Sequence, residues 1–181
     1  MSKMLFPKMA VSNIRKNKKL YVPYIITAIF TVMMFFMNIS IVKNKNVAAM
    51  RGGQNVVVLL QVALVVSFIF SAVFLFYTNS FLMKRRTKEI GLYNILGMEK
   101  KHISLMMLFE NVIITIISLI AGIVFGIIFS RLMFLVLMKL IKADSVPAFV
   151  ISTNAVVVTI IYFISIFAVI FIYNFCQGTD V

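Results

Sequence analysis

ISLMMLFENVIITIISLIAGIVFGIIFSRLMFLVL, residues 103–137, is an apolar stretch that contains only two charged residues, Glu110 and Arg131. Roughly 20 apolar residues in an α-helix are enough to cross the hydrocarbon core of a bilayer. Three further apolar stretches of sufficient length lie at 20–42, 55–83 and 148–175. The sequence therefore predicts an all-α integral membrane protein with four transmembrane helices.

The composition excludes an ordinary soluble domain. Of the 181 residues, 62% are hydrophobic, whereas soluble domains contain about 45–50% apolar residues. We divide the chain into a basic N-terminal segment (1–19), a transmembrane domain (20–175) and a short tail (176–181). The tail carries no cation, which is unusual for a cytoplasmic end and leads us to expect a truncation point there.

The net charge of +13 is concentrated between the apolar stretches. Twelve of the 18 cations lie in 1–19 and in the loop 84–102. Because cytoplasmic loops are enriched in Lys and Arg, this distribution predicts a multi-pass protein of the cell membrane with both termini in the cytoplasm. It also favours anionic lipids over nucleic acid as the partner of the basic segments.

The N-terminal segment has the pattern of a helix that lies on the membrane surface. Phe6, Ala10 and Ile14 recur at i, i+4 spacing among six cations. Such a helix places its apolar side in the interface and its cations toward the headgroups. We therefore predict an N-terminal interfacial helix.

The loop 84–102, KRRTKEIGLYNILGMEKKH, is the most polar internal stretch. Residues 87–96 are compatible with a short helix that carries Ile90, Tyr93 and Leu96 on one side and ends at Gly97. A partly apolar helix of this kind can dock into a groove on a soluble protein. The alternative is a solvated basic loop that only fixes orientation.

The third span contains small residues at four-residue steps. They are Ser118, Gly122, Gly126 and Ser130. A ridge of this kind permits close contact between helices. We favour packing within the chain over homodimerisation.

Glu110 is an intramembrane carboxylate, which is costly and usually has a partner. It could serve as a proton or cation site, but we favour an ion pair with Lys100 or Lys101. His102 and Cys176 are each the single residue of their type. The sequence therefore offers no catalytic or metal-binding constellation, and we expect a protein that is not itself an enzyme.

Two stretches resemble the FtsX-like permeases of ABC transporters. They are FPKMAVSNIRKNKKLYVPYIITAIF, from residue 6, and KRRTKEIGLYNILGMEKKHISLMMLFENVIITIISLIAGIVFG, residues 84–126. Lys88-Glu89-Ile90-Gly91 and Leu96-Gly97 stand in the order of the family loop. The short segment between the first two spans is similar to that of the bacitracin-resistance (BceB) type.

The resemblance implies that the loop is a coupling helix between spans two and three that docks on a separate ATPase dimer. The implied coupling residues are Lys88, Glu89, Ile90, Gly91, Leu92, Leu96 and Gly97. ATP and Mg²⁺ would be bound by that partner, and no cofactor by this chain. The implied activity is the export of, or resistance to, antimicrobial peptides, in association with a membrane histidine kinase.

Permeases of the BceB type continue with further spans and a large outer domain. We therefore expect the present sequence to be the N-terminal portion of such a permease, either as a fragment, through a disrupted reading frame, or as a short stand-alone half-permease, and the remaining half of a permease is an expected partner. Two alternatives remain open. One is a small ion-coupled multidrug transporter that uses Glu110, and the other is a non-transporting membrane adaptor of a sensor kinase.

Overall fold

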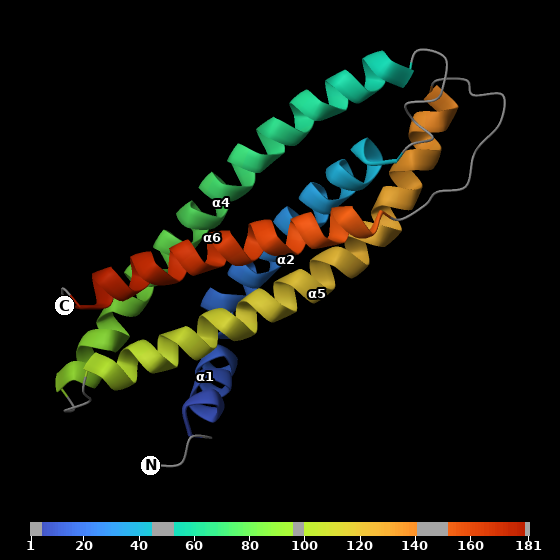
Figure 1. Ribbon diagram of the computed structural model, residues 1–181. Helices are drawn as coiled ribbons and strands as arrows, with labels where there is room; N and C mark the ends of the chain where they lie inside the picture. The colour runs from blue at the N-terminus through green and yellow to red at the C-terminus, as the bar shows by residue number, and fades with distance from the viewer. Residues whose placement is uncertain (1–4, 45–52, 96–99, 141–151, 180–181) are drawn as a thin grey trace.

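The structure, a computed structural model, describes residues 5–44, 53–95, 100–140 and 152–179. Over these ranges all the regular secondary structure is α-helical (Figure 1). The helices are α1 (Leu5–Lys16), α2 (Lys18–Val42), α4 (Gly53–Ile95), α5 (Lys100–Leu140) and α6 (Thr153–Thr179). Four of them are long and apolar enough to cross a membrane. Over the described residues, the prediction of an all-helical protein with four helices suited to cross a membrane is thus confirmed.

α4 and α5 are longer than a bilayer requires. They contain 43 and 41 residues, which correspond to about 60 Å each at 1.5 Å per residue, against a hydrocarbon core of about 30 Å. In α4 the apolar span is limited to Gln54–Arg86. The helix then continues without a break to Ile95.

This continuity corrects one detail of the sequence-based expectation. Residues 87–95 are helical, but they form the last turns of α4 and not a separate helix after a loop. Hydropathy locates the end of the membrane span, whereas helix length depends on backbone propensity. The segment TKEIGLYNI contains only one strong helix breaker, Gly91, which a helix tolerates at a cost of about 1 kcal/mol.

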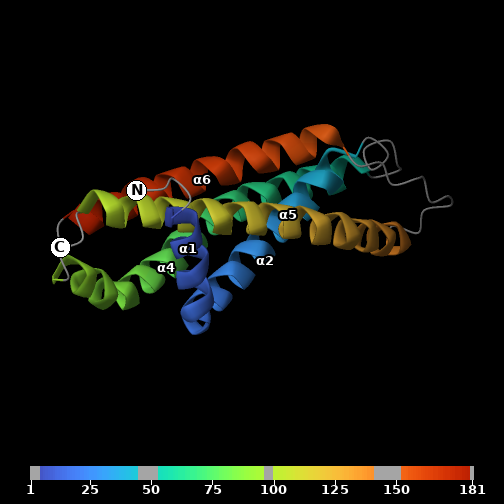
Figure 2. The ribbon, with the colours of Figure 1, turned by 90° about the horizontal axis from the view of Figure 1, so that it is seen from below.

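α2 is the central helix of the bundle and contacts each of the other four. α4 and α5 lie on either side of it and contact each other little, and α6 crosses over α2, α4 and α5 (Figures 1 and 2). The side chains that α2 buries include Ala28, Val32, Phe35 and Phe36. The core of the molecule is therefore built around α2.

Aromatic side chains join α4 to α2 and α6 in the middle of the bundle. The ring of Tyr162 stacks on the rings of Phe35 and Phe68, with centroid distances of 4.7 and 4.2 Å. The hydroxyl of Tyr162 also lies 2.8 Å from the Ser71 hydroxyl. Stacked rings and a satisfied hydroxyl favour a fixed helix spacing at this depth.

α1 packs mainly on the first part of α5. Ala10 and Asn13 are buried, Ile14 is half-buried, and Arg15 and Lys16 are exposed. α1 therefore turns the side that carries Ala10, Asn13 and Ile14 toward the protein. Its location at a membrane interface remains a prediction.

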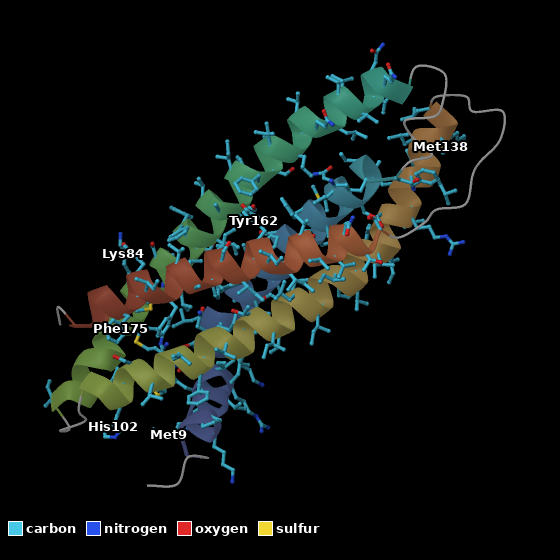
Figure 3. All side chains as sticks on the ribbon, in the orientation of Figure 1. Met9, Lys84, His102, Met138, Tyr162 and Phe175 are labelled. Carbon is cyan, nitrogen blue, oxygen red and sulfur yellow. The ribbon has the colours of Figure 1, made fainter. Side chains whose placement is uncertain are left out.

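The two ends of the bundle differ in composition. α1, the C-terminal ends of α4 and α6 and the start of α5 gather at one end, while the C-terminal end of α2 and the start of α4 lie at the other (Figure 1). Lys84, His102 and Phe175 mark the first end and Met138 the second (Figure 3). We refer to the first as the basic end, since Lys8, Arg15, Lys16, Lys18, Lys19, Lys84 and Arg85 are exposed there.

Candidate functional site

Glu110 lies at the centre of a buried polar cluster near the basic end. Its side chain is almost fully buried and receives hydrogen bonds from three helices. Asn13 Nδ2 in α1 donates to Oε1 at 2.7 Å, and the Tyr21 hydroxyl in α2 donates to Oε2 at 2.8 Å. Arg86 in α4 supplies the third set of contacts. One carboxylate of α5 therefore holds three other helices.

Arg86 forms an ion pair with Glu110 in a bidentate arrangement. Its Nη1 contacts Oε2, and its Nη2 lies 3.2 Å from Oε1. The guanidinium carbon also lies 5.4 Å from the centroid of the Tyr21 ring, within the range of a cation–π contact. Arg86 is only 2% exposed, so both charges are removed from solvent and depend on each other.

The structure supports an ion pair for Glu110, but the partner is Arg86, which the sequence pattern assigns to the loop 84–102. The side chains of Lys100 and Lys101, the expected partners, lie outside the described residues. If α4 and α5 are aligned as a helical hairpin, the residue of α4 that lies level with Glu110 is Arg86. Arg86 and Glu110 lie nine and ten residues from the facing ends of α4 and α5, or about 14–15 Å along each helix, so they meet at the same height.

A second set of polar contacts links α6 to the same end of the bundle. Asn79 in α4 and Asn174 in α6 exchange two amide hydrogen bonds, at 2.7 and 3.1 Å. Asn111, next to Glu110 in α5, donates through Nδ2 to the Phe167 carbonyl at 3.1 Å. Polar side chains thus cross-link all four long helices within one layer. In lipid, such interhelical hydrogen bonds fix helix positions without exposing polar groups.

The cluster does not have the properties of a reaction centre. Each Glu110 oxygen accepts from Arg86 and from one neutral donor. Among the described residues no group of three or more His, Cys, Asp or Glu could hold a metal ion. His102 is half-buried at the start of α5. The arrangement is suited to holding helices together and to transmitting their displacement.

The residues predicted to couple to a partner lie in or just after the last turns of α4. Lys88, Glu89, Ile90, Gly91 and Leu92 belong to its backbone, and Ile95, at its end, is 84% exposed. The side chains of 88–90 and 92 lie outside the described residues, as do Leu96 and Gly97 entirely. Apart from its chain neighbours and the backbone of its own helix, no atom of the described residues lies within 4 Å of a Cβ built on Gly91. This part of α4 therefore projects beyond Arg86 toward the basic end.

The small residues of α5 face α2. A Cβ atom on Gly122 would lie 2.6 Å from Cβ of Val32, and one on Gly126 would lie 2.8 Å from Cδ1 of Phe36. Ser118 and Ser130 are fully buried on either side of the two glycines. The ridge allows close approach of α5 to the central helix within one chain. Arg131, one residue beyond the ridge, is exposed.

The chain is similar to one known protein family and to several known proteins. Residues 61–176 match the family model described as FtsX-like permease C-terminal. The chain is 32% identical over 165 residues to the uncharacterized ABC transporter permease YvcS of Bacillus subtilis, with 90% of this chain covered. It is 30% identical over 170 residues to the bacitracin export permease protein BceB of the same organism, with 93% covered.

A bacitracin export permease protein BceB of Halalkalibacterium halodurans is 29% identical over 165 residues, with 91% of this chain covered. In each of these three matches the aligned region is 26% of the relative. The chain therefore spans about a quarter of the length of these relatives.

Proposed function

Because the chain belongs to the FtsX-like permease family, we propose that it is a transmembrane part of an ABC transporter permease whose helices are moved by ATP hydrolysis in a separate ATPase. The observation that carries the proposal is the path from the end of α4 to the Arg86–Glu110 pair. A continuous helix connects residues 87–95 to Arg86, and Arg86 is bound to a carboxylate that also holds α1 and α2.

The proposed mechanism depends on the rigidity of α4 between residues 87–95 and Arg86. A force on the last turns of α4 acts on a continuous helix, because all its intervening backbone hydrogen bonds are internal. At Arg86 the displacement reaches Glu110 on α5, and through Asn13 and Tyr21 it reaches α1 and α2. A nucleotide-driven movement of a docked ATPase dimer would thereby shift several spans together.

We assign the docking surface to Lys88, Glu89, Ile90, Gly91, Leu92, Leu96 and Gly97. The apolar members would fill a groove on the ATPase, and Glu89 would contact its basic edge. ATP and Mg²⁺ would be held by the ATPase, and this chain would bind no cofactor. The exposed position of Ile95 supports an accessible surface at this end of α4.

For the substrate we propose antimicrobial peptides of the bacitracin class, since two of the relatives are named bacitracin export permeases. The remaining part of such a permease, anionic lipids at the basic end and a membrane histidine kinase are the further proposed partners. In this account the protein resides in the bacterial cell membrane with both termini in the cytoplasm.

The structure disfavours the ion-coupled alternative. A coupling carboxylate has to exchange its proton or cation during transport, whereas Glu110 is bound to a permanently charged guanidinium and two neutral donors. Arg keeps its charge at all accessible pH values. The adaptor alternative differs from our proposal in that the protein would not transport a substrate and would not be moved by an ATPase.

Co-purification with the cognate ATPase tests the docking surface. Replacing Ile90 and Leu96 together by Asp should abolish ATPase binding while the spans still insert, because charge would enter an apolar contact. Leu140→Asp is the matched control, since Leu140 is 78% exposed at the opposite end of the bundle. Retained binding by the inserted double variant would contradict the proposal.

A further inference from the structure

A small cavity lies beside the Arg86–Glu110 pair where all four long helices meet. Its volume is about 20 Å³. The lining comes from α2, α4, α5 and α6, and seven of its eleven residues carry a polar side-chain group, although most of the lining surface is apolar. It consists of Tyr21, Tyr24, Asn79, Leu82, Met83, Arg86, Met107, Glu110, Asn111, Ile114 and Asn174.

Tyr24 makes this cavity different from an ordinary packing defect. The side chain is 2% exposed, and its hydroxyl has no hydrogen-bond partner in the part of the chain that the structure describes. A buried hydroxyl without a partner is costly, so such groups are nearly always satisfied by protein or by ordered water. Tyr24 lines the cavity, which offers the space for such a partner.

The volume of the cavity and the polar and charged groups that line it indicate which ligand it can hold. A single water needs roughly 10–15 Å³ of such volume and two to four polar partners; the cavity has this volume and is lined by several polar side chains, of which Tyr24 has a hydroxyl without a partner among the described residues. A bare cation would be repelled by Arg86 and an anion by Glu110. A neutral molecule with both donors and acceptors fits the mixed lining of hydroxyls, amides and charged groups.

We propose that this cavity is a binding site for one structural water molecule, with the Tyr24 hydroxyl as one of its hydrogen-bond partners. The water bridges polar side chains from different helices. Because a bound water can exchange partners without leaving unpaired groups, it permits small shifts of the helices within the polar layer. This site is independent of the proposed ATPase partner and of the transported substrate.

Hydroxyl-radical labelling in H₂¹⁸O tests the site, since radicals formed from a bound water oxidise the side chains beside it. Met107, which lines the cavity and is 6% exposed, is the reporter. Met33, 7% exposed, is the control matched for burial, and Met106 is the control matched for position along α5. We expect Met107 to be labelled several-fold faster than either control, and Tyr24→Phe to reduce this labelling.

Two results would overturn the proposal. One is labelling of Met107 no faster than that of Met33 and Met106. The other is fast labelling of Met107 that Tyr24→Phe leaves unchanged, which would separate the water from Tyr24. Thermal unfolding adds an independent readout: removal of a hydrated hydroxyl should lower the melting temperature, whereas a rise would mean that the hydroxyl is buried dry and without a partner.

Discussion

Replacing Arg86 by Met tests whether the buried ion pair holds the bundle together. Met keeps much of the length of the side chain but removes the charge, so Glu110 retains only Asn13 and Tyr21 as the donors described here. Loss of one partner of a buried pair costs about 3–5 kcal/mol, and the cation–π contact adds about 0.5–2 kcal/mol. The two remaining donors to Glu110 offset part of this, which leaves a loss of about 2–4 kcal/mol.

The adjacent Arg85 provides the matched control. It is exposed, and its guanidinium carbon lies 4.8 Å from the centroid of the Phe81 ring. Arg85→Met should therefore cost less than about 1 kcal/mol. The assay is equilibrium unfolding of the detergent-solubilised protein, followed by circular dichroism during titration with a denaturing detergent.

A double-mutant cycle isolates the interaction between the two charges. Glu110→Gln alone leaves Arg86 buried without a carboxylate and should also be destabilising. The double variant removes both charges, so its loss should be smaller than the sum of the single losses by about 2 kcal/mol or more. Additive effects, or equal effects of Arg86→Met and Arg85→Met, would mean that the pair does not join the helices.

Two further predictions concern packing and topology. Gly122→Ala should lower the melting temperature, because the added methyl group would meet the Val32 side chain. Gly91→Ala is the control, since nothing of the described residues beyond its own helix lies near that position, and it should be neutral or stabilising by up to about 1 kcal/mol. Equal effects of the two substitutions in thermal unfolding would contradict the contact between Gly122 and Val32. On a Cys176→Ser background in intact cells, Asn46→Cys should react with a membrane-impermeant thiol reagent and Thr87→Cys should not. The reverse labelling pattern would invert the proposed topology.

The sequence was sufficient to predict the four spans because a bilayer imposes length and hydropathy on every helix that crosses it. The same property hides where a helix ends, so the continuation of α4 to Ile95 was not predicted. Hydropathy also treats Arg86 as a loop residue, although it lies at the end of the apolar span and is buried. Its pairing with Glu110 depends on the register of the hairpin, which a hydropathy pattern does not contain.

The two neutral residues that donate hydrogen bonds to Glu110 could not be predicted from the hydropathy pattern, for a different reason. Asn13 is polar within an amphipathic helix, and its burial depends on where α1 packs on α5. Tyr21 and Tyr24 lie near the start of an apolar span, where aromatic residues commonly mark the interface. Both line the cavity, and only the tertiary arrangement shows that Tyr21 binds the carboxylate whereas the Tyr24 hydroxyl has no partner among the described residues.

In the proposed function, the end of α4 transmits movement from an ATPase to the spans. Spin labels on Ile95→Cys and Lys19→Cys, both at exposed positions and on a Cys176→Ser background, report the separation of α4 and α2 by pulsed electron paramagnetic resonance in the reconstituted complex with the cognate ATPase. We predict that ATP shifts the distance distribution, and that the Ile90→Asp, Leu96→Asp double variant shows no shift. An identical distribution with and without ATP, in a complex shown to contain bound ATPase, would contradict the account.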